Sequence, residues 1–488
     1  MQMQKAANGV VEPTRTLPIF AEVDVLVAGG GSAGWYAAVA AARNGAKTLL
    51  IERHGSLGGT VTNAMVQPFM NFHSPLGEAV VGGVWQEMLN NMKFLHGTSG
   101  PLPAGRGKAP WGKNPTLTPF DPEVLRFVAQ ELVLGAGAEL LLHTMIVDTV
   151  MEGDELRGVV IENKSGRQVV LAKCVVDATG DADIAAFAGA PFMFGREEDN
   201  LTMPMSLYIK MRNIDYKAMG DYVLAQPEEF RWWSFPDVDP TLPPEMERAP
   251  VSCSGFLSIV RAGRESGALL LGRETINILP CPRKGEAVLN CTRIGRLDPT
   301  SAADLTTAEV EARRQAMSVI SWAPGNLPGF KDAELVSIAP CIGVRESRRI
   351  IGEYVLQLED VLKGRKFDDA IARSAYNVDI HNPHNDKSTW YEIEDAYDIP
   401  YRCLLPKKIE NLLVAGRCIS TTHEASGSAR MTPHVAATGE AAGTAAALAV
   451  KKGVNPRTLN LAALRKQLLS QNVNLGSNPS VRNLETVN

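Results

Sequence analysis

The feature that most constrains this chain is a glycine-rich turn between a short apolar segment and an alanine-rich one. Residues 23–28 are apolar apart from one aspartate, which is typical of a parallel strand buried on both faces. The turn GGGSAG at 29–34 follows directly, and an alanine-rich segment with helical character extends to about residue 44. A second apolar segment occupies residues 47–51. This order predicts a strand–helix–strand unit.

Three glycines in the turn have the spacing GxGxxG, and each has a separate task in a dinucleotide-binding unit. Gly29 permits the tight turn, Gly31 lets the backbone approach a pyrophosphate, and Gly34 lets helix and sheet pack closely. The start of the helix adds unpaired N–H groups and the positive end of the helix dipole. We therefore expect Gly29, Gly31, Ser32, Ala33 and Gly34 to hold the phosphates of a dinucleotide.

An acidic residue, Glu52, ends the second strand at the distance from the glycines where a ribose is held. A carboxylate suits this place because it accepts hydrogen bonds from two hydroxyl groups at once. GxGxxG alone is a weak signal, but strand, glycines, helix, strand and carboxylate all follow in order. The sequence therefore favours a dinucleotide site over an ordinary glycine turn.

A second glycine-bearing loop follows Glu52 and separates two kinds of cofactor. It runs from Arg53 to Gly58, Gly59 and Thr60 and is expected beside the same pyrophosphate, where nicotinamide-binding domains rarely need a second loop. This segment resembles the glutathione-reductase-like flavoproteins and, more closely, the FAD-dependent oxidoreductase family, in which LGGT follows the first strand–helix–strand unit. The resemblance implies that FAD is the cofactor.

The resemblance extends over residues 22–450. It continues at FDPE (120–123), through the strand pair within 139–176, and at DATGDAD (177–183). It resumes at YDIPYRCLLP (397–406) and NLLVAGRCIS (411–420), followed by a helix expected from about residue 433 to 448. It implies a second set of FAD contacts, made by Ile146, Ala178, Thr179, Gly180, Asp181, Gly416, Arg417, Pro433, His434 and Val435.

The expected fold is α/β, with a discontinuous FAD-binding domain of the glutathione-reductase-like Rossmann type and an inserted α+β substrate or cap domain. Trp, Pro and Met enrich the inserted region, where residues 232–244 are expected to be rich in loops. Thr306 and Glu309 form a capping signal for a helix over 307–322. The expected divisions are an N-terminal leader (1–21), FAD-binding segments (22–190 and 340–453), the cap (191–339) and a C-terminal tail (454–488).

Three histidines are candidates for moving a proton, because imidazole titrates near neutral pH and can accept the proton of an alcohol or amine. Chain order is expected to bring His73, His423 and His434 toward the flavin, although each could equally be a hydrogen-bonded structural histidine. Arg345 and Glu346 are expected to form an ion pair between cap and FAD-binding domain, and the alternative is that Arg345 binds a substrate carboxylate.

No spacing in the chain indicates a metal site. HxxxH, CxxC and EF-hand patterns are absent from the sequence, and HNPHND at 381–386 is expected to be a polar, solvated loop because a proline breaks helical geometry there. The seven cysteines are scattered, which signals neither a disulfide framework nor a redox dithiol. A reducing cytoplasm fits this cysteine pattern.

Composition excludes several partners. The net charge of -5 gives no basic footprint for nucleic acid, and the longest run of small apolar residues, 441–450, is far too short to span a bilayer. The first 20 residues lack the apolar core of a signal peptide. A small-molecule substrate is therefore the expected partner, and an external electron donor or acceptor and a homo-oligomer stay open.

The sequence thus indicates an FAD-dependent oxidoreductase, either a dehydrogenase, an oxidase or a reductase, that transfers hydride between a small organic substrate and flavin N5. No second strand–glycine–helix unit follows, so an internal NAD(P)H domain is not expected. The alternatives are a flavin-dependent monooxygenase or hydroxylase that uses an external reductant, an FAD-containing RNA-modifying protein, and an NAD-dependent dehydrogenase without flavin. The last does not explain the matching segment at 411–450.

Overall fold

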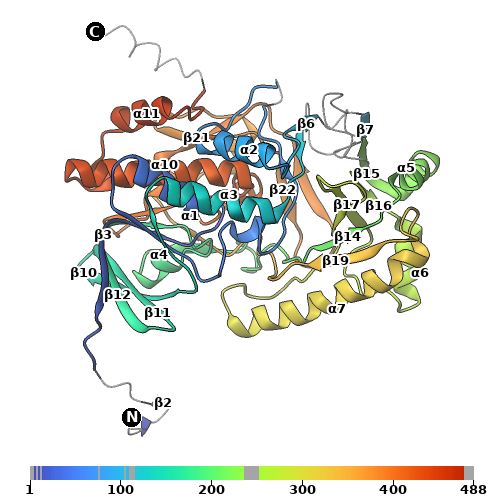
Figure 1. The fold of residues 1–488 in the computed structure, drawn as a ribbon, viewed down its shortest axis with the longest axis horizontal. Coiled ribbons are helices and arrows are strands. Elements are labelled where there is room, and N and C mark those ends of the chain that lie inside the picture. The colour runs from blue at the N-terminus through green and yellow to red at the C-terminus, as the bar shows by residue number, and fades with distance from the viewer. Residues whose placement is uncertain are drawn as a thin grey trace.

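A seven-stranded sheet organises the first lobe, which lies on the left of Figure 1 in this computed structural model. The structure describes residues 5–6, 9–10, 14–74, 77–103, 106–108, 116–235 and 252–476. Strands β9 (Glu139–Leu141), β4 (Thr48–Ile51), β3 (Ile19–Ala28), β12 (Gly166–Asp177) and β25 (Leu412–Val414) lie parallel in this spatial order. Strands β11 (Glu155–Asn163) and β10 (Met145–Glu152) continue from β12 as an antiparallel meander. The predicted α/β class is confirmed.

The central strand β3 is buried on both faces, as its apolar sequence predicts. Val25 and Val27 pack in the core that contains helices α1 (Gly34–Arg43) and α10 (Thr432–Lys452), whereas Leu26 and Ala28 pack in the core that contains α4 (Asp183–Phe187). Successive side chains of a strand point to opposite faces, so one strand serves both cores. Two distant parts of the chain, α1 and α10, thereby cover the same face of the sheet (Figure 1).

Glycines let α10 approach α1 closely. A Cβ atom at Gly439 would lie 2.1 Å from the carbonyl oxygen of Ala33, and one at Gly443 would lie 2.0 Å from that of Ala37. Real Cβ atoms do not come so near, so only glycine fits at either place. This contact packs the middle of α10 against the start of α1, where the glycine-rich turn lies.

A second, antiparallel sheet organises the other lobe, on the right of Figure 1. Its buried face packs on helices α5 (Tyr216–Ala225), α6 (Leu257–Glu265) and α7 (Ala302–Asn326). Its strands, in spatial order, are β19 (Glu334–Ile338), β14 (Ile209–Arg212), β18 (Ala287–Asn290), β17 (Ile276–Pro280), β16 (Ser252–Gly255), β15 (Phe230–Phe235) and β7 (Arg106–Lys108).

Two expectations for this lobe are wrong. Helix α7 begins earlier than the predicted 307–322, because the Ser301 side chain caps it by accepting a hydrogen bond from Asp304 N at 3.3 Å. Glu309 does not complete a capping box and instead accepts a hydrogen bond from Ile342 N at 2.7 Å. Residues 232–235 of the stretch expected to be rich in loops belong to strand β15. The prolines expected at 236–244 lie outside the described residues.

Shorter elements complete the chain. Ile19–Ala21 of the predicted leader belong to β3, and α11 lies within the predicted tail, while residues 1–4, 7–8, 11–13 and 477–488 of these two segments lie outside the described part. The remaining helices are α2 (Val84–Phe94), α3 (Pro122–Gly135), α8 (Leu358–Leu362), α9 (His423–Ala429) and α11 (Leu461–Ser470). Small sheets are formed by β1 (Lys5–Ala6) and β2 (Gly9–Val10), by β5 (Phe69–Met70), β8 (Thr116–Thr118) and β6 (Leu102–Pro103), by β13 (Phe192–Phe194) and β20 (Arg348–Ile350), by β21 (Ala370–Ser374) and β24 (Tyr397–Pro400), and by β22 (Val378–His381) and β23 (Ser388–Tyr391).

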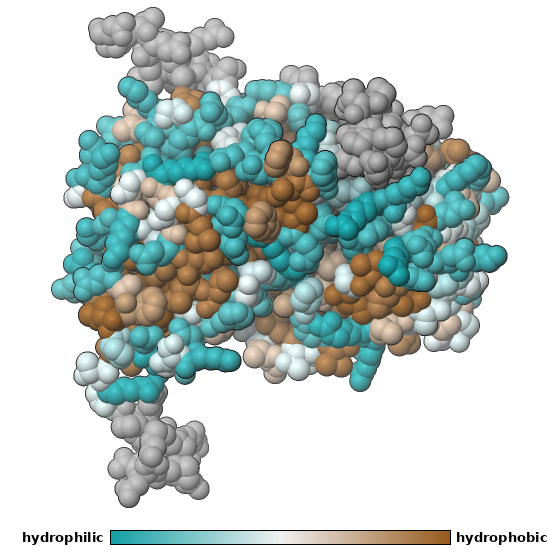
Figure 2. Space-filling model, viewed as in Figure 1, coloured by the Kyte–Doolittle hydropathy of each residue, from teal (hydrophilic) through white to brown (hydrophobic). Residues whose placement is uncertain are grey.

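The surface in Figure 2 mixes polar side chains with separate apolar areas. Exposed apolar residues include Phe127 and Leu134 on α3 and Leu335 and Val336 on the edge strand β19. Within the described ranges, no helix combines the length and the apolar character that crossing a bilayer requires.

Candidate active site

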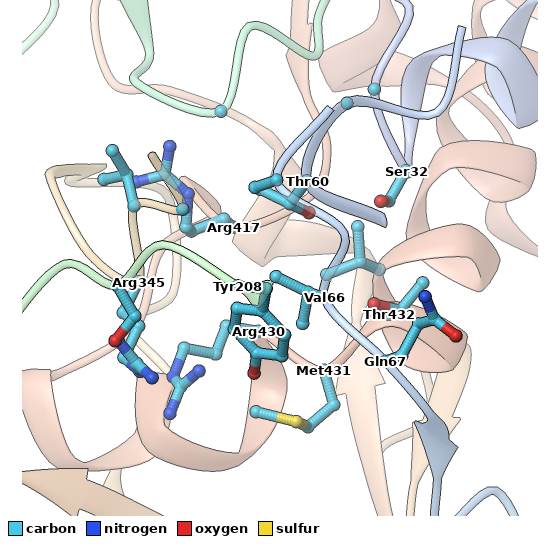
Figure 3. A pocket seen from close by; sticks show the side chains of 18 of the residues that line it. Ser32, Thr60, Val66, Gln67, Tyr208, Arg345, Arg417, Arg430, Met431 and Thr432 are labelled. Atoms are coloured by element: carbon cyan, nitrogen blue, oxygen red, sulfur yellow. The ribbon is translucent and has the colours of Figure 1, made fainter. Parts of the chain in front are cut away.

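A cavity of about 540 Å³ runs between the two lobes. Figure 3 shows Ser32 and Thr60 on one side of it and Tyr208, Arg345 and Arg430 on another. Most of the residues that the sequence singled out line this cavity. They are Gly29, Gly31, Ser32, Ala33, Glu52, Arg53, Gly59, Thr60, Ala178, Thr179, Gly180, Asp181, Arg345, Gly416, Arg417, Pro433 and Val435.

The turn at 29–34 leaves no room for a side chain at Gly29 or Gly34. A Cβ atom at Gly34 would lie 1.7 Å from the carbonyl oxygen of Gly29, and one at Gly29 would lie 2.7 Å from that of Ala178. Gly29 also has a φ of +93°, which favours glycine. Gly34 does not line the cavity, so its part is to let helix α1 start directly against the turn.

Glu52 holds the glycine-rich turn from the end of β4. Its side chain is only 6% exposed, and its two oxygens accept hydrogen bonds from Gly30 N at 2.7 Å and from His54 N at 2.8 Å. A carboxylate has further lone pairs, and Glu52 also lines the cavity. It can therefore fix two loops and still accept hydrogen bonds from a ligand.

The second glycine loop lies directly on the first. Gly58 N donates a hydrogen bond to Gly30 O at 2.9 Å, and the Ser32 hydroxyl donates one to Gly58 O at 3.2 Å. A Cβ atom at Gly59 would lie 2.8 Å from the Cα of Gly31, so the two backbones touch there. Gly58 itself does not line the cavity, but it sets this contact.

Two aspartates of the DATGDAD segment have different tasks. Asp177 is fully buried and accepts hydrogen bonds from Thr179 and from Ala185 N, and burial raises its pKa to about 6. Asp181 lines the cavity and pairs with Arg417 at 2.8 Å. Burial alone would raise the pKa of Asp181, but the charge and hydrogen bonds of its partners outweigh burial and lower it. Asp177 thus shapes the turn, and Asp181 orients a cationic group at the cavity wall.

The start of helix α10 faces the cavity. Thr432, Pro433 and Val435 line it, and Figure 3 shows Thr432 near Gln67. The first turn of a helix offers unpaired N–H groups and the positive end of the dipole. This end of the cavity therefore favours a group with negative charge.

None of the three candidate histidines lines the cavity. His434 is fully buried, its Nε2 accepts a hydrogen bond from Ala375 N at 3.4 Å, and burial lowers its pKa to about 3. His423 is bound to Glu346 at 2.8 Å, and His73 lies 3.3 Å from the Thr116 hydroxyl. Ile146, on strand β10, also lies away from the cavity. The positions of the three histidines in the sequence bring them near the site, but their side chains do not line the cavity.

Arg345 and Glu346 do not form the expected ion pair, because they point in different directions. Glu346 is 1% exposed and accepts hydrogen bonds from Arg349, from His423 and from Met203 N. Arg345 lines the cavity, where its Nη1 donates to Pro204 O at 2.6 Å and to the Ser206 hydroxyl at 2.8 Å. The buried ion pair of this segment is instead formed by Glu346 and Arg349, which are three residues apart.

The far end of the cavity carries a chain of polar side chains that the sequence did not indicate. In the hairpin of β22 and β23, the Ser388 hydroxyl lies 2.9 Å from Nδ1 of His381, whose Nε2 lies 3.1 Å from Asp379 Oδ2. His381 is 8% exposed and Asp379 is 6% exposed, and burial lowers the pKa of His381 to about 3. The expectation of a solvated loop at HNPHND is therefore wrong at His381, although His384 is exposed.

A profile of the family described as FAD dependent oxidoreductase matches residues 24–468 of this chain. The chain belongs to the FAD-dependent oxidoreductase family. Its cofactor is FAD, as the two glycine loops and the late segment at 411–435 indicated. The reaction that this member of the family catalyses needs a separate argument.

Individual relatives match less of the chain. Thiamine thiazole synthase of Methanococcus aeolicus is 30% identical over 176 residues, which are 34% of this chain and 57% of that protein, so the match spans little more than half of the relative. Dihydrolipoyl dehydrogenase of Trypanosoma brucei brucei is 51% identical over 49 residues, 10% of each chain. Among solved structures, p-nitrophenol 4-monooxygenase from Pseudomonas putida is 11% identical with a TM-score of 0.47, covering 95% of this chain and 91% of that one.

The cavity of this FAD-dependent oxidoreductase family member fits FAD. The glycine backbone at 29–34 and 58–60 and the start of α1 suit a pyrophosphate, and Glu52 suits a ribose. Buried polar atoms at the cavity wall also lack a partner among the described residues, and these include both amide atoms of Gln67 and Nδ2 of Asn63. Buried polar atoms are normally hydrogen-bonded, so these atoms fit a bound group that supplies donors and acceptors. In the described ranges, no cluster of three His, Cys, Asp or Glu side chains has the arrangement of a metal site.

Proposed function

We propose that this protein is a dehydrogenase, oxidase or reductase that transfers a hydride between a small organic substrate and N5 of bound FAD. The observation that carries the proposal is the continuity of the cavity. One end is lined by the glycine loops and the start of α10, and the other end by Tyr208, Arg345, Asp379 and His381. FAD supplies the hydride chemistry when it is bound, so the chain needs only to place a substrate and move a proton.

Asp379 is the group that moves the proton in this proposal. Its Oδ1 is buried at the cavity wall and has no partner among the described residues, while its Oδ2 faces His381. Burial favours the neutral acid, but the hydrogen bond from His381 and the charges of Arg430 and Arg345 outweigh burial and lower the pKa of Asp379. Asp379 is therefore a carboxylate at neutral pH, ready to accept the proton of a substrate hydroxyl or amine as hydride leaves.

His381 positions this carboxylate. Because its pKa is lowered to about 3, the ring is neutral at physiological pH and can donate one hydrogen bond and accept another. Donation from Nε2 to Asp379 leaves Nδ1 to accept from the Ser388 hydroxyl. This arrangement turns Oδ1 of Asp379 toward the substrate space. His73, His423 and His434 have no part in the proposed step, because they do not reach the cavity.

The test is anaerobic reduction of the purified holoprotein. Candidate alcohols, amines and carboxylic acids are added, and loss of the visible flavin absorbance identifies a substrate. Asp379→Asn is expected to lower the rate of bleaching by about 10²–10⁴-fold at unchanged FAD content, the usual contribution of a positioned acid or base. Glu392→Gln, at an exposed carboxylate beside the same hairpin, is the matched control.

Two results would reject the proposal. If the flavin of Asp379→Asn loses its visible absorbance at the wild-type rate, Asp379 is not the group that accepts the proton. Reduction that occurs only with an external donor, followed by oxygen insertion into the substrate, would favour the alternative of a flavin-dependent hydroxylase.

A further inference from the structure

The end of the cavity that is lined by Tyr208, Arg345, Asp379 and His381 is called the cap end here. It holds more positive than negative charge. Arg273, Arg345 and Arg430 line it together with one carboxylate in direct reach, that of Asp379. Asp386 also lines the cavity, but it lies 3.0 Å from Arg231, which Glu274 also pairs at 2.7 Å. The three cavity arginines therefore exceed their available carboxylate by two charges.

Neutral groups, not carboxylates, hold most of these arginines in place. Arg345 donates to Pro204 O and to the Ser206 hydroxyl, and Arg273 donates to Asn290 O at 3.2 Å. Arg430 donates to the backbone oxygen of Asp379 at 3.2 Å, and its nearest approach to that carboxylate is 3.7 Å. Such contacts orient a guanidinium group without cancelling its charge, so the cluster is pre-organised for an anion.

Unpaired donors remain in the cluster. Nε of Arg273 and Nε of Arg430 are buried and have no hydrogen-bond partner among the described residues, and Arg273 is only 6% exposed. Figure 3 shows Arg345, Arg430 and Tyr208 close to one another at the cavity wall. A buried donor without a partner is costly, and a guanidinium group matches a carboxylate with two parallel hydrogen bonds.

The acidity of the arginines agrees with this picture. Burial, followed by repulsion from Arg430 and Arg273, lowers the pKa of Arg345 to about 10. Burial also lowers the pKa of Arg273, and burial, followed by repulsion from Arg345 and Arg273, lowers that of Arg293 to about 9. A buried cation whose pKa is lowered by neighbouring cations, as at Arg345, is stabilised by a bound anion.

We propose that Arg273, Arg345 and Arg430 bind a small organic dianion, a dicarboxylate, as the substrate of the cavity. The proposal rests on the proposed function and adds the chemical class of its substrate. Two excess charges favour a dianion over a monocarboxylate, and the planar fork of each guanidinium group suits a carboxylate. Tyr208 adds a hydroxyl group at the same wall, and burial raises its pKa, so that it stays protonated and can donate.

The test measures binding to the holoprotein without turnover. Four probes of defined charge are titrated while the visible flavin spectrum and the heat of binding are recorded: succinate, butyrate, succinamide and inorganic phosphate. Succinate is expected to bind about 10–100-fold more tightly than butyrate, the range for one added charge-assisted contact, and succinamide is expected to leave the spectrum unchanged.

Variants locate the site. Arg345→Gln and Arg430→Gln are each expected to weaken succinate binding about 10–100-fold at unchanged FAD content. Arg212→Gln is the matched control, because Arg212 lies on strand β14 of the cap sheet, is exposed and pairs with Glu334. If either cavity variant loses FAD or fails to fold, the comparison of succinate with butyrate and succinamide in the wild type decides instead.

The proposal is overturned if succinamide or butyrate binds as tightly as succinate, or if folded Arg345→Gln and Arg430→Gln bind it normally. Phosphate binding equal to that of succinate would indicate a general anion site and overturn the dicarboxylate assignment. These outcomes are separate from the proposed function. If the protein binds succinate but no substrate reduces its flavin, the anion site is supported and hydride transfer is rejected. If an uncharged substrate reduces the flavin of both variants at the normal rate, hydride transfer is supported and the anion site is rejected.

Discussion

The two ends of the cavity are built in different ways. The nucleotide end is backbone: two glycine loops in mutual contact, held by Glu52 and placed at the start of helix α1. The cap end is side chain: Tyr208, Arg273, Arg345, Asp379 and Arg430 come from five segments that are far apart in sequence. A pyrophosphate is common to every protein that binds FAD, whereas the substrate differs between enzymes. Backbone therefore recognises the constant group, and side chains recognise the variable one.

Because of this difference, the two ends of the cavity should tolerate different substitutions. Glycine backbone in close contact accepts no added atom, because the atom would meet another backbone. Side chains at a cavity wall can be shortened without displacing the fold, because space and solvent remain in front of them. The nucleotide end should thus fail by losing the cofactor, and the cap end should fail by losing the substrate alone.

The largest effect is expected from one methyl group at the nucleotide end. Gly34→Ala would place a Cβ atom 1.7 Å from the Gly29 carbonyl oxygen, so the turn must move. We expect about 4 kcal/mol or more of destabilisation, in the range of the most damaging substitutions, together with loss of bound FAD. Gly135→Ala is the control, because Gly135 ends helix α3 with nothing within 4 Å of an added Cβ. Thermal unfolding and the ratio of flavin to protein absorbance measure both, and normal FAD content in Gly34→Ala would refute the argument.

The next largest effect is on the free energy of unfolding, and it should differ between two neighbouring residues at the boundary of the two lobes, Arg345 and Glu346. Glu346→Ala leaves Arg349 and His423 buried without their carboxylate, which we expect to cost about 3–5 kcal/mol. Arg345→Ala removes a cavity side chain and is expected to change unfolding free energy by less than about 1 kcal/mol while substrate binding falls. Urea unfolding of both variants provides the comparison. Equal destabilisation would show that Arg345 supports the fold as much as Glu346 does.

The sequence could predict the nucleotide end because the residues that form it lie close together in the chain. Strand β3, the turn at 29–34, helix α1 and Glu52 follow one another, and local patterns of apolar residues and glycine specify each of them. Helix α10 was found in the same way, since Pro433 marks its first turn. The wrong start of helix α7 is also local, because Ser301 is an equally good cap and lies further upstream.

The cap end could not be predicted, because burial of a polar side chain depends on partners that are distant in sequence. HNPHND is polar in composition, and nothing in these six residues indicates that a hairpin turns His381 inward while His384 stays exposed. The direction of a side chain in extended backbone also changes with every residue, so Arg345 and Glu346 could be placed near the site but not assigned to its two sides. Of the side chains that line the cap end, the sequence identified only Arg345, for which substrate binding was one of two alternative roles.

A smaller effect is expected at Glu52, because its side chain holds the backbone of the glycine-rich turn and also lines the cavity. Glu52→Gln keeps the shape but replaces a charged acceptor of Gly30 N and His54 N by a neutral amide. Loss of one charged hydrogen bond corresponds to about 1.5–3 kcal/mol, so FAD should bind about 10–100-fold more weakly. Glu22→Gln, at an exposed carboxylate on the neighbouring strand β3, is the control. Fluorescence titration of the apoprotein with FAD measures both, and equal dissociation constants would remove Glu52 from the nucleotide site.

The last effect depends on pH and tests a carboxyl group remote from both ends, Glu440 in the middle of α10. Burial raises its pKa from 4.5 to about 7, although its Oε2 accepts a hydrogen bond from Val84 N at 3.0 Å. Between pH 4.5 and 7 the unfolded chain releases this proton and the folded chain keeps it, so the free energy of unfolding falls as pH rises. The loss is about 3 kcal/mol in total and does not grow further above the folded pKa.

Glu440→Gln should remove this pH dependence, because an amide can accept the hydrogen bond from Val84 N without titrating. Urea unfolding of the wild type and the variant from pH 5 to pH 8 measures the difference between them, which should widen as pH rises in favour of the variant. Since α10 brings Thr432 and Pro433 to the cavity, FAD content over the same range shows whether a change in its middle reaches its start. Parallel stability curves for the two proteins would mean that Glu440 ionises normally in the fold, and equal FAD content over this pH range would mean that the start of α10 is independent of this carboxyl group.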